Sequence, residues 1–538
     1  MKRAVERLIT GMAVAAGLYA VVLMHGAGHT LLALTMLVMV AVGAWTYTSP
    51  RTHAARYLFP GIAAALVFVV FPMVYTVSIG FTNYSSAHLL EFERAREVLL
   101  EERVPQGEPP RPFHLERVGR DQIRIRLAAT ADGPEQVTAP QALNEWVVDE
   151  ADRKALRPHS LVWPLMAAEP HKAQAPKDSN VADASGVQAL SMRERVALLP
   201  ALRRLSLTDP ADSADSASKG LSYTLSSLRE FTKTRALYRS EPDGSLTDQV
   251  SGVRYRPDDR EGFFVSEAGE RLQPGYRVNV GWAHYVRMFT EDKFRAPFLS
   301  VFVWTVVFSA LTVVGAGTLG MLLAVLLNWE SLRGRGIYRV VLFLPYAVPG
   351  FISILIFKGL FNQNLGEVNF ILNGLLGIRP AWFSDPLLAK VMLLIVNVWL
   401  GFPYMMVLCS GLIKSIPSDL YEASAVVGAG PFTNFWRITL PLILKPLTPL
   451  LISAFAFNFN NFVLISLLTG GRPDQLDTPL PAGTTDILVS YTWRIAFQDS
   501  GQQLGLAAAI STVIFLIVAA ITLVQMRFTR VALQEARH

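Results

Sequence analysis

Three asparagines stand inside the apolar run Phe455–Ile465, FAFNFNNFVLI. A carboxamide in hydrocarbon needs hydrogen-bond partners, because leaving it unsatisfied costs on the order of several kcal/mol. If the run is one helix, residues three and four apart share a face. That face comprises Ala454, Phe457, Asn458, Asn461 and Ile465. Asn460 falls off it, and we expect Asn460 to bond a neighbouring helix or a backbone carbonyl.

An aromatic ring beside two amides is a chemically suitable place for a sugar. The apolar C–H faces of a sugar can lie on the ring, and its hydroxyls donate to and accept from amides. No Arg or Lys stands nearby, which disfavours a phosphate or carboxylate ligand. Alternatively, such amides join membrane helices, at about 0.6 to 2 kcal/mol per bond. The residue types leave the two interpretations about even for Asn458 and Asn461, and favour helix joining for Asn460.

The composition indicates a polytopic membrane protein. Of the 538 residues 51% are hydrophobic and 17% are charged, and the mean hydropathy is +0.33. A bilayer is crossed by about 20 apolar residues in a helix. Runs near this length predict about eight spans, at 8–25, 30–48, 58–80, 298–327, 338–358, 388–413, 444–468 and 504–526. The fifth is the least uniform, because Pro345 and Pro349 interrupt it.

Basic residues mark alternate connections between these spans. They gather at 2–7, 51–56, 333–339, 414–445 and 527–537. Lys and Arg accumulate in cytoplasmic loops, so the sequence predicts that these connections and both termini face the cytoplasm. This topology accounts for the net charge of +6 without nucleic acid or any other acidic partner.

The segment between the third and fourth spans has the composition of a soluble domain. Residues 84–297 are rich in charged residues, Pro and Gly, and the predicted topology places them outside. The alternation in DQIRIRLAA predicts a strand, and Pro242-Asp243-Gly244 predicts a turn between two more. Residues 85–104 have the charge pattern of a helix. We expect a β-rich domain with helical additions that serves as a docking surface or as a structural cap.

Several kinds of chemistry are missing. The chain has no G-x-x-x-x-G-K-[ST] motif, so any ATP that drives it must bind another subunit. Cys409 is the only cysteine, no Ser/His/Asp grouping stands out, and we expect no metal site and no catalytic residue. No acidic residue occupies the apolar centre of a span after residue 298, which disfavours an ion-coupled carrier.

The loop 417–441, IPSDLYEASAVVGAGPFTNFWRITLP with its preceding Ile, predicts a short exposed helix on the cytoplasmic side. Ser418 can cap its start, and the acidic Asp419 and Glu422 complement the helix dipole. Gly428 is a typical C-terminal stop. A small-residue helix of this kind suits the groove of a partner protein.

This loop resembles the EAA loop of ABC importer permeases, in Glu-Ala-Ser at 422–424, in Gly428 and in Ile-Thr-Leu-Pro at 438–441. The wider chain is similar to maltose/maltodextrin permeases of the MalF type, through FVWTVVFSALT, PAWFSDP, GFPYMM and FAFNFNNFVLI. The resemblance runs from about residue 81 to 500. It implies three N-terminal transmembrane helices at 1–83, a periplasmic domain at 84–297, a type I permease core at 298–526 and a cytoplasmic tail at 527–538.

The resemblance also implies roles for particular residues. Such permeases hold maltose midway across the membrane, and the matching positions are Gly401, Tyr404, Phe457, Asn458 and Asn461. Coupling to the ATPase falls to Glu422, Ala423 and Gly428. The chain departs from the pattern in two places: Val427 stands where many members have Asp, and Ala454 stands where they have Ser, beside Ser453.

The function implied is that of the permease subunit of an ATP-driven maltose/maltodextrin importer in a bacterial inner membrane, without a cofactor or catalysis of its own. Its expected partners are a second, MalG-like permease subunit, a MalK-like ATPase dimer, a periplasmic maltose-binding protein, the sugar and membrane lipid. The alternatives are an ABC permease for another neutral sugar or a glycerol-phosphate-like solute, a secondary carrier, or a receptor or scaffold without a transport role.

Overall fold

The computed structural model describes residues 2–28, 30–119, 122–130, 134–142, 161–168, 187–190, 192–209, 221–329, 331–476, 478, 480–499 and 501–535. The chain forms two compact units, one of residues 87–278 and one of the residues before and after them. The inserted unit is therefore shorter than the expected domain 84–297. Residues 279–297 belong to the helical unit, where α9 (Ala283–Thr290) and the first turns of α10 (Asp292–Asn328) lie.

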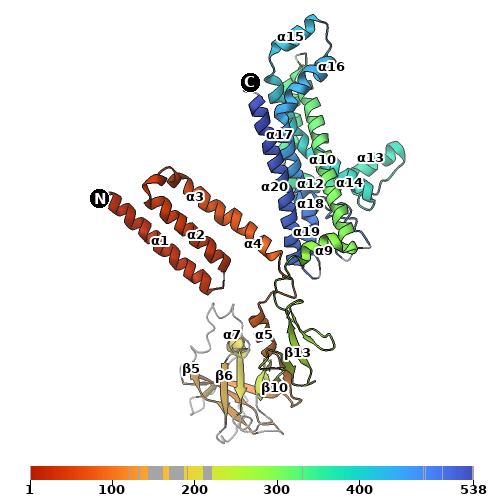
Figure 1. The fold of residues 1–538 in the computed structure, drawn as a ribbon. Coiled ribbons are helices and arrows are strands. Elements are labelled where there is room, and N and C mark those ends of the chain that lie inside the picture. The colour runs from red at the N-terminus through yellow and green to blue at the C-terminus, as the bar shows by residue number, and fades with distance from the viewer. Residues whose placement is uncertain are drawn as a thin grey trace. The chain divides into compact units, whose positions relative to one another are not determined.

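The helical unit contains most of the expected spans (Figure 1). Within the described residues six helical segments are long and apolar enough to cross a membrane, and a bent pair forms a possible seventh. The first expected span corresponds to the shorter apolar stretch Thr10–Gly26 of α1. Besides α9 and α10, the helices of this unit include α1 (Lys2–Gly26), α2 (Thr30–Thr48), α3 (Ala55–Ala65), α4 (Phe71–Ile79), α14 (Pro386–Lys414), α16 (Pro431–Asn434), α17 (Leu440–Phe459), α19 (Leu488–Phe497) and α20 (Leu504–Glu535).

Helices α10 and α14 pack closely, and a glycine permits the contact. A Cβ atom built on Gly320 would lie 2.6 Å from the Cβ of Met405 and 2.7 Å from the backbone nitrogen of Met406. Any larger residue would push the two helices apart. Small residues at helix contacts are typical of membrane proteins, because close backbone packing replaces the hydrophobic effect that lipid cannot supply.

Two expected spans are not straight helices. Residues 338–358 divide into α11 (Arg335–Ala347) and α12 (Gly350–Leu360), bent by 91°. Pro349 lies at this break, where its ring disfavours a continuous helix. Residues 444–468 divide into α17, which ends at Phe459, and α18 (Phe462–Leu468). The prediction of one continuous helix through the asparagine run is therefore wrong.

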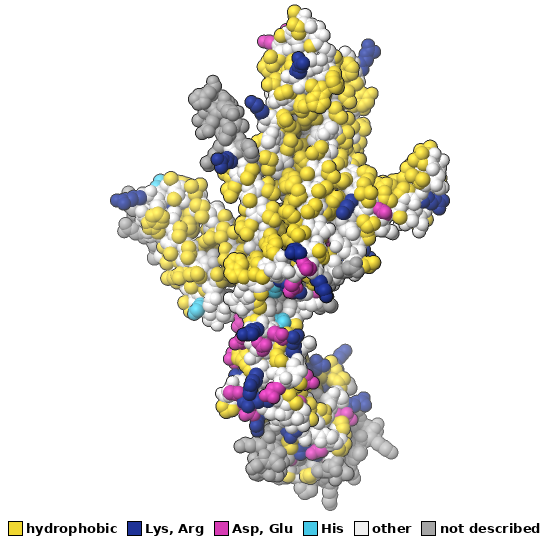
Figure 2. Space-filling model, turned by 45° about the vertical axis from the view of Figure 1, so that its right-hand side comes forward, with side chains coloured by type: hydrophobic (Ala, Val, Ile, Leu, Met, Phe, Trp, Pro, Cys, Tyr) yellow, Lys and Arg dark blue, Asp and Glu magenta, His cyan; other side chains and the backbone are white. Residues whose placement is uncertain are grey.

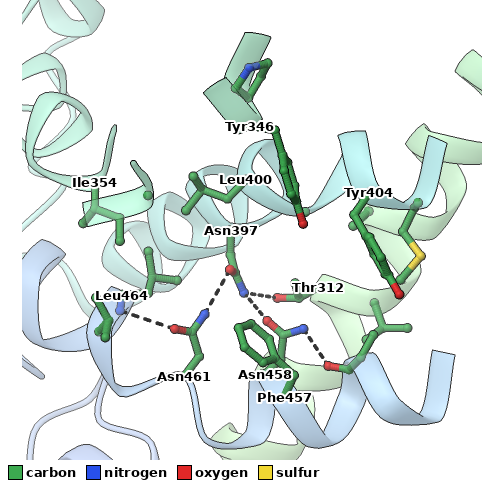
Figure 3. Close-up of a pocket in the computed structure, with 18 of the residues that line it drawn as sticks. Thr312, Tyr346, Ile354, Asn397, Leu400, Tyr404, Phe457, Asn458, Asn461 and Leu464 are labelled. Carbon is green, nitrogen blue, oxygen red and sulfur yellow. Dashed lines mark hydrogen bonds between the residues drawn. The ribbon is translucent and has the colours of Figure 1, made fainter. Parts of the chain in front are cut away.

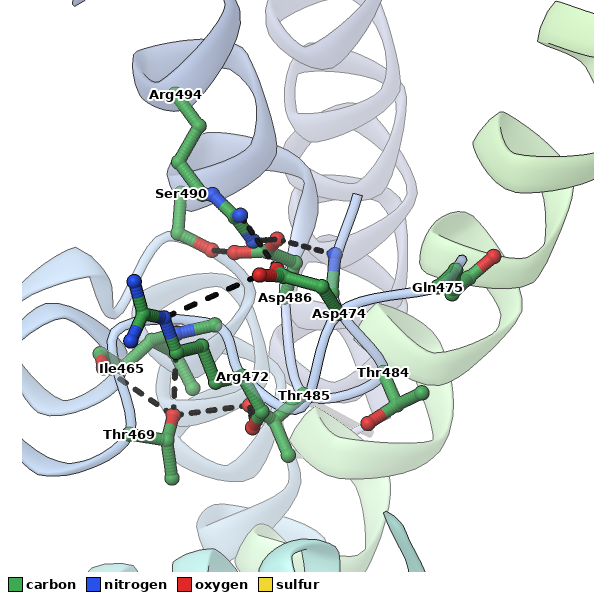
Figure 4. A network of polar contacts seen from close by, with 12 residues as sticks. Ile465, Thr469, Arg472, Asp474, Gln475, Thr484, Thr485, Asp486, Ser490 and Arg494 are labelled. Carbon is green, nitrogen blue, oxygen red and sulfur yellow. Dashed lines mark hydrogen bonds and ion pairs between the residues drawn. The ribbon is translucent and has the colours of Figure 1, made fainter. Parts of the chain in front are cut away.

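A buried ionic network fixes the segment between α18 and α19 (Figure 4). Arg494 of α19 donates to Asp486 at 2.7 Å and to Asp474 at 2.5 Å. Asp486 also accepts from the backbone nitrogen of Gly483 and from Ser490, both at 2.8 Å. A buried charge is tolerated only when it is paired and hydrogen-bonded, as Asp486 is here.

The inserted unit is β-rich, as expected. Among its described residues ten strands form one sheet in the order β1-β10-β9-β8-β6-β4-β3-β2-β7, with β5 beside β3, and β10 also pairs with β2, so the sheet closes on itself. These strands are β1 (Arg103–Pro105), β2 (Arg111–Val118), β3 (Gln122–Leu127), β4 (Gln136–Thr138), β5 (Gln141–Ala142), β6 (Leu161–Ala167), β7 (Val187–Ala189), β8 (Leu205–Thr208), β9 (Leu221–Ser227) and β10 (Glu230–Ala236). The predicted alternation holds in β3, where Ile123, Ile125 and Leu127 are fully buried.

A second, smaller sheet follows in the same unit. In the described part of the chain it has the order β11-β12-β13-β14, with β11 (Tyr238–Ser240), β12 (Leu246–Asp248), β13 (Arg254–Asp258) and β14 (Phe263–Ser266). The predicted turn joins β11 to β12, and Gly244 there has φ +82°. Among the described residues of this unit the helices are α5 (Phe92–Leu100) and α7 (Met192–Leu202). The helix expected over 85–104 is thus limited to α5.

We predict that an ionic cluster stabilises the larger sheet in a pH-dependent way. Burial opposes ionisation of Glu116, but hydrogen bonds from Arg126 at 2.5 Å and Arg124 at 2.7 Å outweigh it and lower the pKa of Glu116 below its ordinary value. The stabilisation is therefore complete at neutral pH and is lost as the pH falls through the lowered pKa. Glu116→Gln should reduce the opening free energy of β2 and β3 by about 1 to 3 kcal/mol at pH 7.

The measurement is amide hydrogen exchange of β2 and β3 in the full chain. The control is Glu241→Gln. In the parent the carboxylate of Glu241 accepts from Arg239, whose side chain is exposed, so little stability should be lost with this ion pair. Equal protection of β2 in the Glu116→Gln variant and the parent at pH 7 would contradict the assignment.

Candidate functional site

A cavity of about 670 Å³ opens among the helices of the membrane unit. Residues of α10, α11, α12, α14 and α17 line it, together with the break between α17 and α18. Its size falls in the range of small-molecule sites, about 300 to 1,000 Å³. The described residues that line it include no charged side chain.

All five residues expected at a sugar site line this cavity, namely Gly401, Tyr404, Phe457, Asn458 and Asn461. They differ in exposure: Asn458 is 8% exposed, Tyr404 is 42% exposed and Phe457 is 72% exposed. The two rings therefore offer open apolar faces beside a buried amide. A Cβ atom built on Gly401 would lie 3.3 Å from the Cβ of Ala316, so a larger residue would enter the cavity or the α10 contact.

Asn461 reaches the cavity by a different geometry from the predicted one. The helix ends at Phe459, and Asn461 caps the start of α18, where its Oδ1 accepts from the backbone nitrogen of Leu464 at 3.4 Å. Ile465, predicted on the same face, is instead fully buried in the core of the bundle. The break separates Asn461 from the helical face that carries Phe457 and Asn458, yet brings all three to one cavity.

Asn460 lies outside the cavity, as its position off the predicted face indicated. Its side chain is exposed, and its Nδ2 donates to the carbonyl oxygen of Ala456 at 3.4 Å. We expected Asn460 to bond either a neighbouring helix or a backbone carbonyl, and it bonds a backbone carbonyl of α17.

Asn397, which the sequence did not indicate as a site residue, is the centre of the polar contacts (Figure 3). Its Nδ2 donates to Thr312 Oγ1 at 3.1 Å and to Asn458 Oδ1 at 2.8 Å, and its Oδ1 accepts from Asn461 Nδ2 at 3.2 Å. Asn458 Nδ2 in turn donates to the carbonyl oxygen of Ala454 at 2.8 Å. An amide inside the apolar run 388–413 was a signal of the same kind as the asparagines of 455–465.

The cavity has the chemistry of a site for a neutral, hydroxyl-rich ligand. Amides can donate and accept at the same time, as a hydroxyl does. The hydrogen-bonded residues Asn397, Thr312, Asn458 and Asn461 form what we call the amide network. Figure 3 shows Tyr346 and Tyr404 on one side of this network and Phe457 beside it. In the structure the amides bond one another across helices, which confirms helix joining, and they also line the cavity, where a sugar contact stays a prediction.

The loop expected to meet an ATPase forms a short exposed helix, α15 (Ser418–Val426), at the end of the bundle where α20 also ends (Figure 1). The prediction that Ser418 caps it is wrong: the cap position is Pro417, and no side chain bonds the first turn. Glu422 and Ala423 are exposed, and Val427 is 81% exposed.

Glycine ends this helix as predicted. Gly428 has φ +76°, a conformation that costs other residues energy, and its nitrogen donates to the carbonyl oxygen of Ala425 at 3.0 Å. A hydrogen bond of 2.9 Å between Tyr421 and Thr439 then ties α15 to the start of α17. The helix α15, which lies between α14 and α17 in the chain, is therefore hydrogen-bonded to the start of α17.

Comparison with known families agrees with this architecture. Residues 316–532 match the family described as binding-protein-dependent transport system inner membrane component. Residues 90–281 match the maltose transport system permease protein MalF P2 domain, which is close to the compact unit 87–278. The fold and the first match define the class of the protein: it is an inner-membrane permease component of a binding-protein-dependent transport system.

Relatives of nearly equal length narrow the class. The maltose/maltodextrin transport system permease protein MalF of Escherichia coli strain K12 is 48% identical over 519 residues, covering 95% of this chain and 94% of the relative. Those of Klebsiella aerogenes and Photorhabdus laumondii are 46% and 45% identical with the same coverage. This chain belongs to the MalF family of permeases.

We predict that Asn397 holds the break between α17 and α18 in place. Asn397→Leu removes all three of its hydrogen bonds and leaves the buried Asn458 and the half-buried Asn461 short of a partner, at about 0.6 to 2 kcal/mol per bond. Amide hydrogen exchange of residues 459–464 should become faster. Thr312→Val, which removes one of the bonds, is the graded control and should have a smaller effect. Unchanged exchange in Asn397→Leu would show that the break is held by other contacts.

Proposed function

We propose that this chain is the permease subunit of an ATP-driven importer of maltose and maltodextrins. The observation that carries the proposal is an uncharged cavity lined by amides and open aromatic rings, in a chain that belongs to the MalF family. A neutral sugar matches such a lining, whereas a phosphorylated solute calls for Arg or Lys, which the described lining residues do not include.

The proposed binding mode follows from side-chain chemistry. The exposed faces of Tyr404 and Phe457 take the C–H faces of glucose rings, and Asn458 and Asn461 exchange hydrogen bonds with hydroxyls. Because these amides already bond each other at 2.8 to 3.2 Å through Asn397, the sugar replaces existing partners and leaves no amide unsatisfied. Gly401 leaves room for the ligand beside the α10 contact.

The family departure at Ala454 affects this site directly. Ala454 offers its backbone carbonyl to Asn458 and no hydroxyl, while the neighbouring Ser453 also lines the cavity. We infer that Ser453 takes over part of the hydroxyl contact, with a shifted preference among maltodextrin lengths.

Coupling to ATP is proposed to run through α15. The helix lies between α14, which carries Tyr404, and α17, which carries Phe457, so a displacement of α15 moves two walls of the cavity. Glu422 is the charged contact with the ATPase. The small side chain of Ala423 allows the ATPase to approach the helix closely, and Gly428 ends the helix. Val427 adds an apolar contact where a second charge is absent.

The assembly proposed around the chain has three further components. These are a MalG-like permease subunit, a MalK-like ATPase dimer at α15, and a maltose-binding protein at the unit 87–278. ATP is bound and hydrolysed by the ATPase dimer, and this chain needs no cofactor. The alternation of basic connections supports cytoplasmic termini and a periplasmic location for the inserted unit.

The sugar site is tested by removing the amides that face the cavity. Asn458→Ala with Asn461→Ala should lower ATP-dependent maltose uptake by more than about tenfold, since two or more hydrogen bonds of about 1 kcal/mol each are lost. The complex should still assemble, and its ATPase should still respond to the binding protein.

Asn460→Ala is the matched control, because Asn460 belongs to the same run but lies outside the cavity. It should transport at the parental rate. Parental uptake by the Asn458 and Asn461 double variant, or equal loss in the Asn460 control, would refute the sugar site.

The coupling role is tested by charge reversal on α15. Glu422→Lys should weaken attachment of the ATPase and abolish stimulation of ATP hydrolysis by the binding protein, because it places a cation where an anion is proposed to dock. Copurification of the ATPase and its stimulated activity are the measurements. Asp419→Lys changes the charge equally on the same exposed helix and should have a lesser effect. Normal assembly and stimulation in Glu422→Lys would count against docking at this position.

A further inference from the structure

Helix α13 (Glu367–Leu376) projects from the side of the bundle with large apolar side chains uncovered (Figures 1 and 2). Phe370 is 82% exposed, Leu375 is 76% exposed and Ile371 is 55% exposed. Figure 2 shows this arm mostly in the colour of hydrophobic side chains. A contiguous apolar surface of this kind is unfavourable in water and indicates a partner or a membrane.

In the first half of α13 the exposed and packed residues lie on different faces, and from Asn373 to Leu376 the helix is exposed on all sides. At about 100° per residue, Phe370, Ile371 and Gly374 point one way, and Ile378 just beyond the helix continues their line. The opposite face carries Val368, Asn369 and Leu372, which are buried or half-buried. The helix therefore begins with an inner face that packs on its own connection, and it has an outer apolar face that none of the described residues covers.

Asn369 fixes the helix rigidly in this orientation. It is 3% exposed, its Oδ1 accepts from Trp382 Nε1 at 2.8 Å, and its Nδ2 donates to the carbonyl oxygens of Gln363 and Pro380, both at 3.0 Å. The Trp382 ring meets Phe361 edge to face, with centroids 4.9 Å apart. Because these contacts join both ends of the connection, the apolar face cannot turn inward without breaking a buried polar cluster.

Helix α13 lies in the connection between two membrane segments, α12 and α14. α12 ends at Leu360 and the long span α14 begins at Pro386, where Asp385 accepts from the backbone nitrogens of Leu387 and Leu388, both at 2.8 Å. Only residues 361–366 separate α12 from α13. In the first turn of α14 Leu387 is 69% exposed, so apolar surface continues from the arm onto a span. Trp is enriched at such boundaries, which suits Trp382.

We propose that α13 is an interfacial helix that lies in the lipid headgroup layer, with Phe370, Ile371 and Ile378 turned into the acyl chains. Amphipathic helices bind membranes in this way, about 5 to 10 Å into the boundary. The exposed Arg379 beyond the end of α13 then meets lipid phosphate. In this position α13 holds the ends of α12 and α14, which line the cavity, at the membrane surface.

The depth of α13 can be measured by spin labelling. The full chain with Cys409→Ala carries a single label at Phe370→Cys, at Asn373→Cys on the flank of the same helix, or at Val250→Cys in the inserted unit, where Val250 is 65% exposed. Each is placed in nanodiscs of phosphatidylethanolamine and phosphatidylglycerol, alone and with cysteine-free partner subunits. Collisions with oxygen and with a water-soluble nickel chelate give the depth.

The label at 370 should favour oxygen and lie about 5 to 10 Å below the headgroup boundary, both alone and in the assembled transporter. The label at 373 should be shallower, and the label at 250 should favour the nickel chelate. A label at 370 that collides mainly with the chelate would place the face in water. One that becomes immobile and inaccessible to both reagents only on assembly would place it against a partner protein. Either result overturns the proposal.

Discussion

The central constraint of the membrane unit is that an amide in a nonpolar interior must be hydrogen-bonded. Asn397 meets this constraint for several helices at once, through bonds to Thr312 on α10, to Asn458 on α17 and to Asn461 at the start of α18. Four elements thus converge on one side chain. These bonds join the helices around the cavity, and the same amides give its otherwise mostly apolar lining a polar part.

This arrangement explains how a single set of residues can serve both structure and transport. The amides are satisfied without ligand, so the empty site is not penalised, and a sugar hydroxyl can take either role in each bond. The break after Phe459 places Asn461 beside Asn458 although they do not share a helical face. Since α15 joins α14 to α17, the walls that carry the amides are also those that the proposed ATPase contact moves.

Periodicity and composition predicted much of this molecule, because they report on each element's own surroundings. The apolar runs located the spans, and the alternation of Ile123 and Ile125 located a buried strand. The break at Asn461 was not predicted, since a helical pattern continues across it in the sequence. The role of Asn397 depends on residues 61 to 85 positions away, and no local pattern reports such contacts. The prediction of a cap at Ser418 failed because the helix starts one residue earlier than such a cap requires, which puts Pro417 at the cap position.

The central claim, that an uncharged amide network selects a neutral sugar for ATP-driven import, is tested most directly by uptake into proteoliposomes that contain the chain, its partner subunits and the binding protein. Labelled maltose should accumulate only with ATP inside, and excess glycerol phosphate should leave the rate unchanged, because the described lining of the cavity offers a phosphate no cation. Maltose uptake without ATP, or ATP-dependent uptake of glycerol phosphate in place of maltose, would contradict the account.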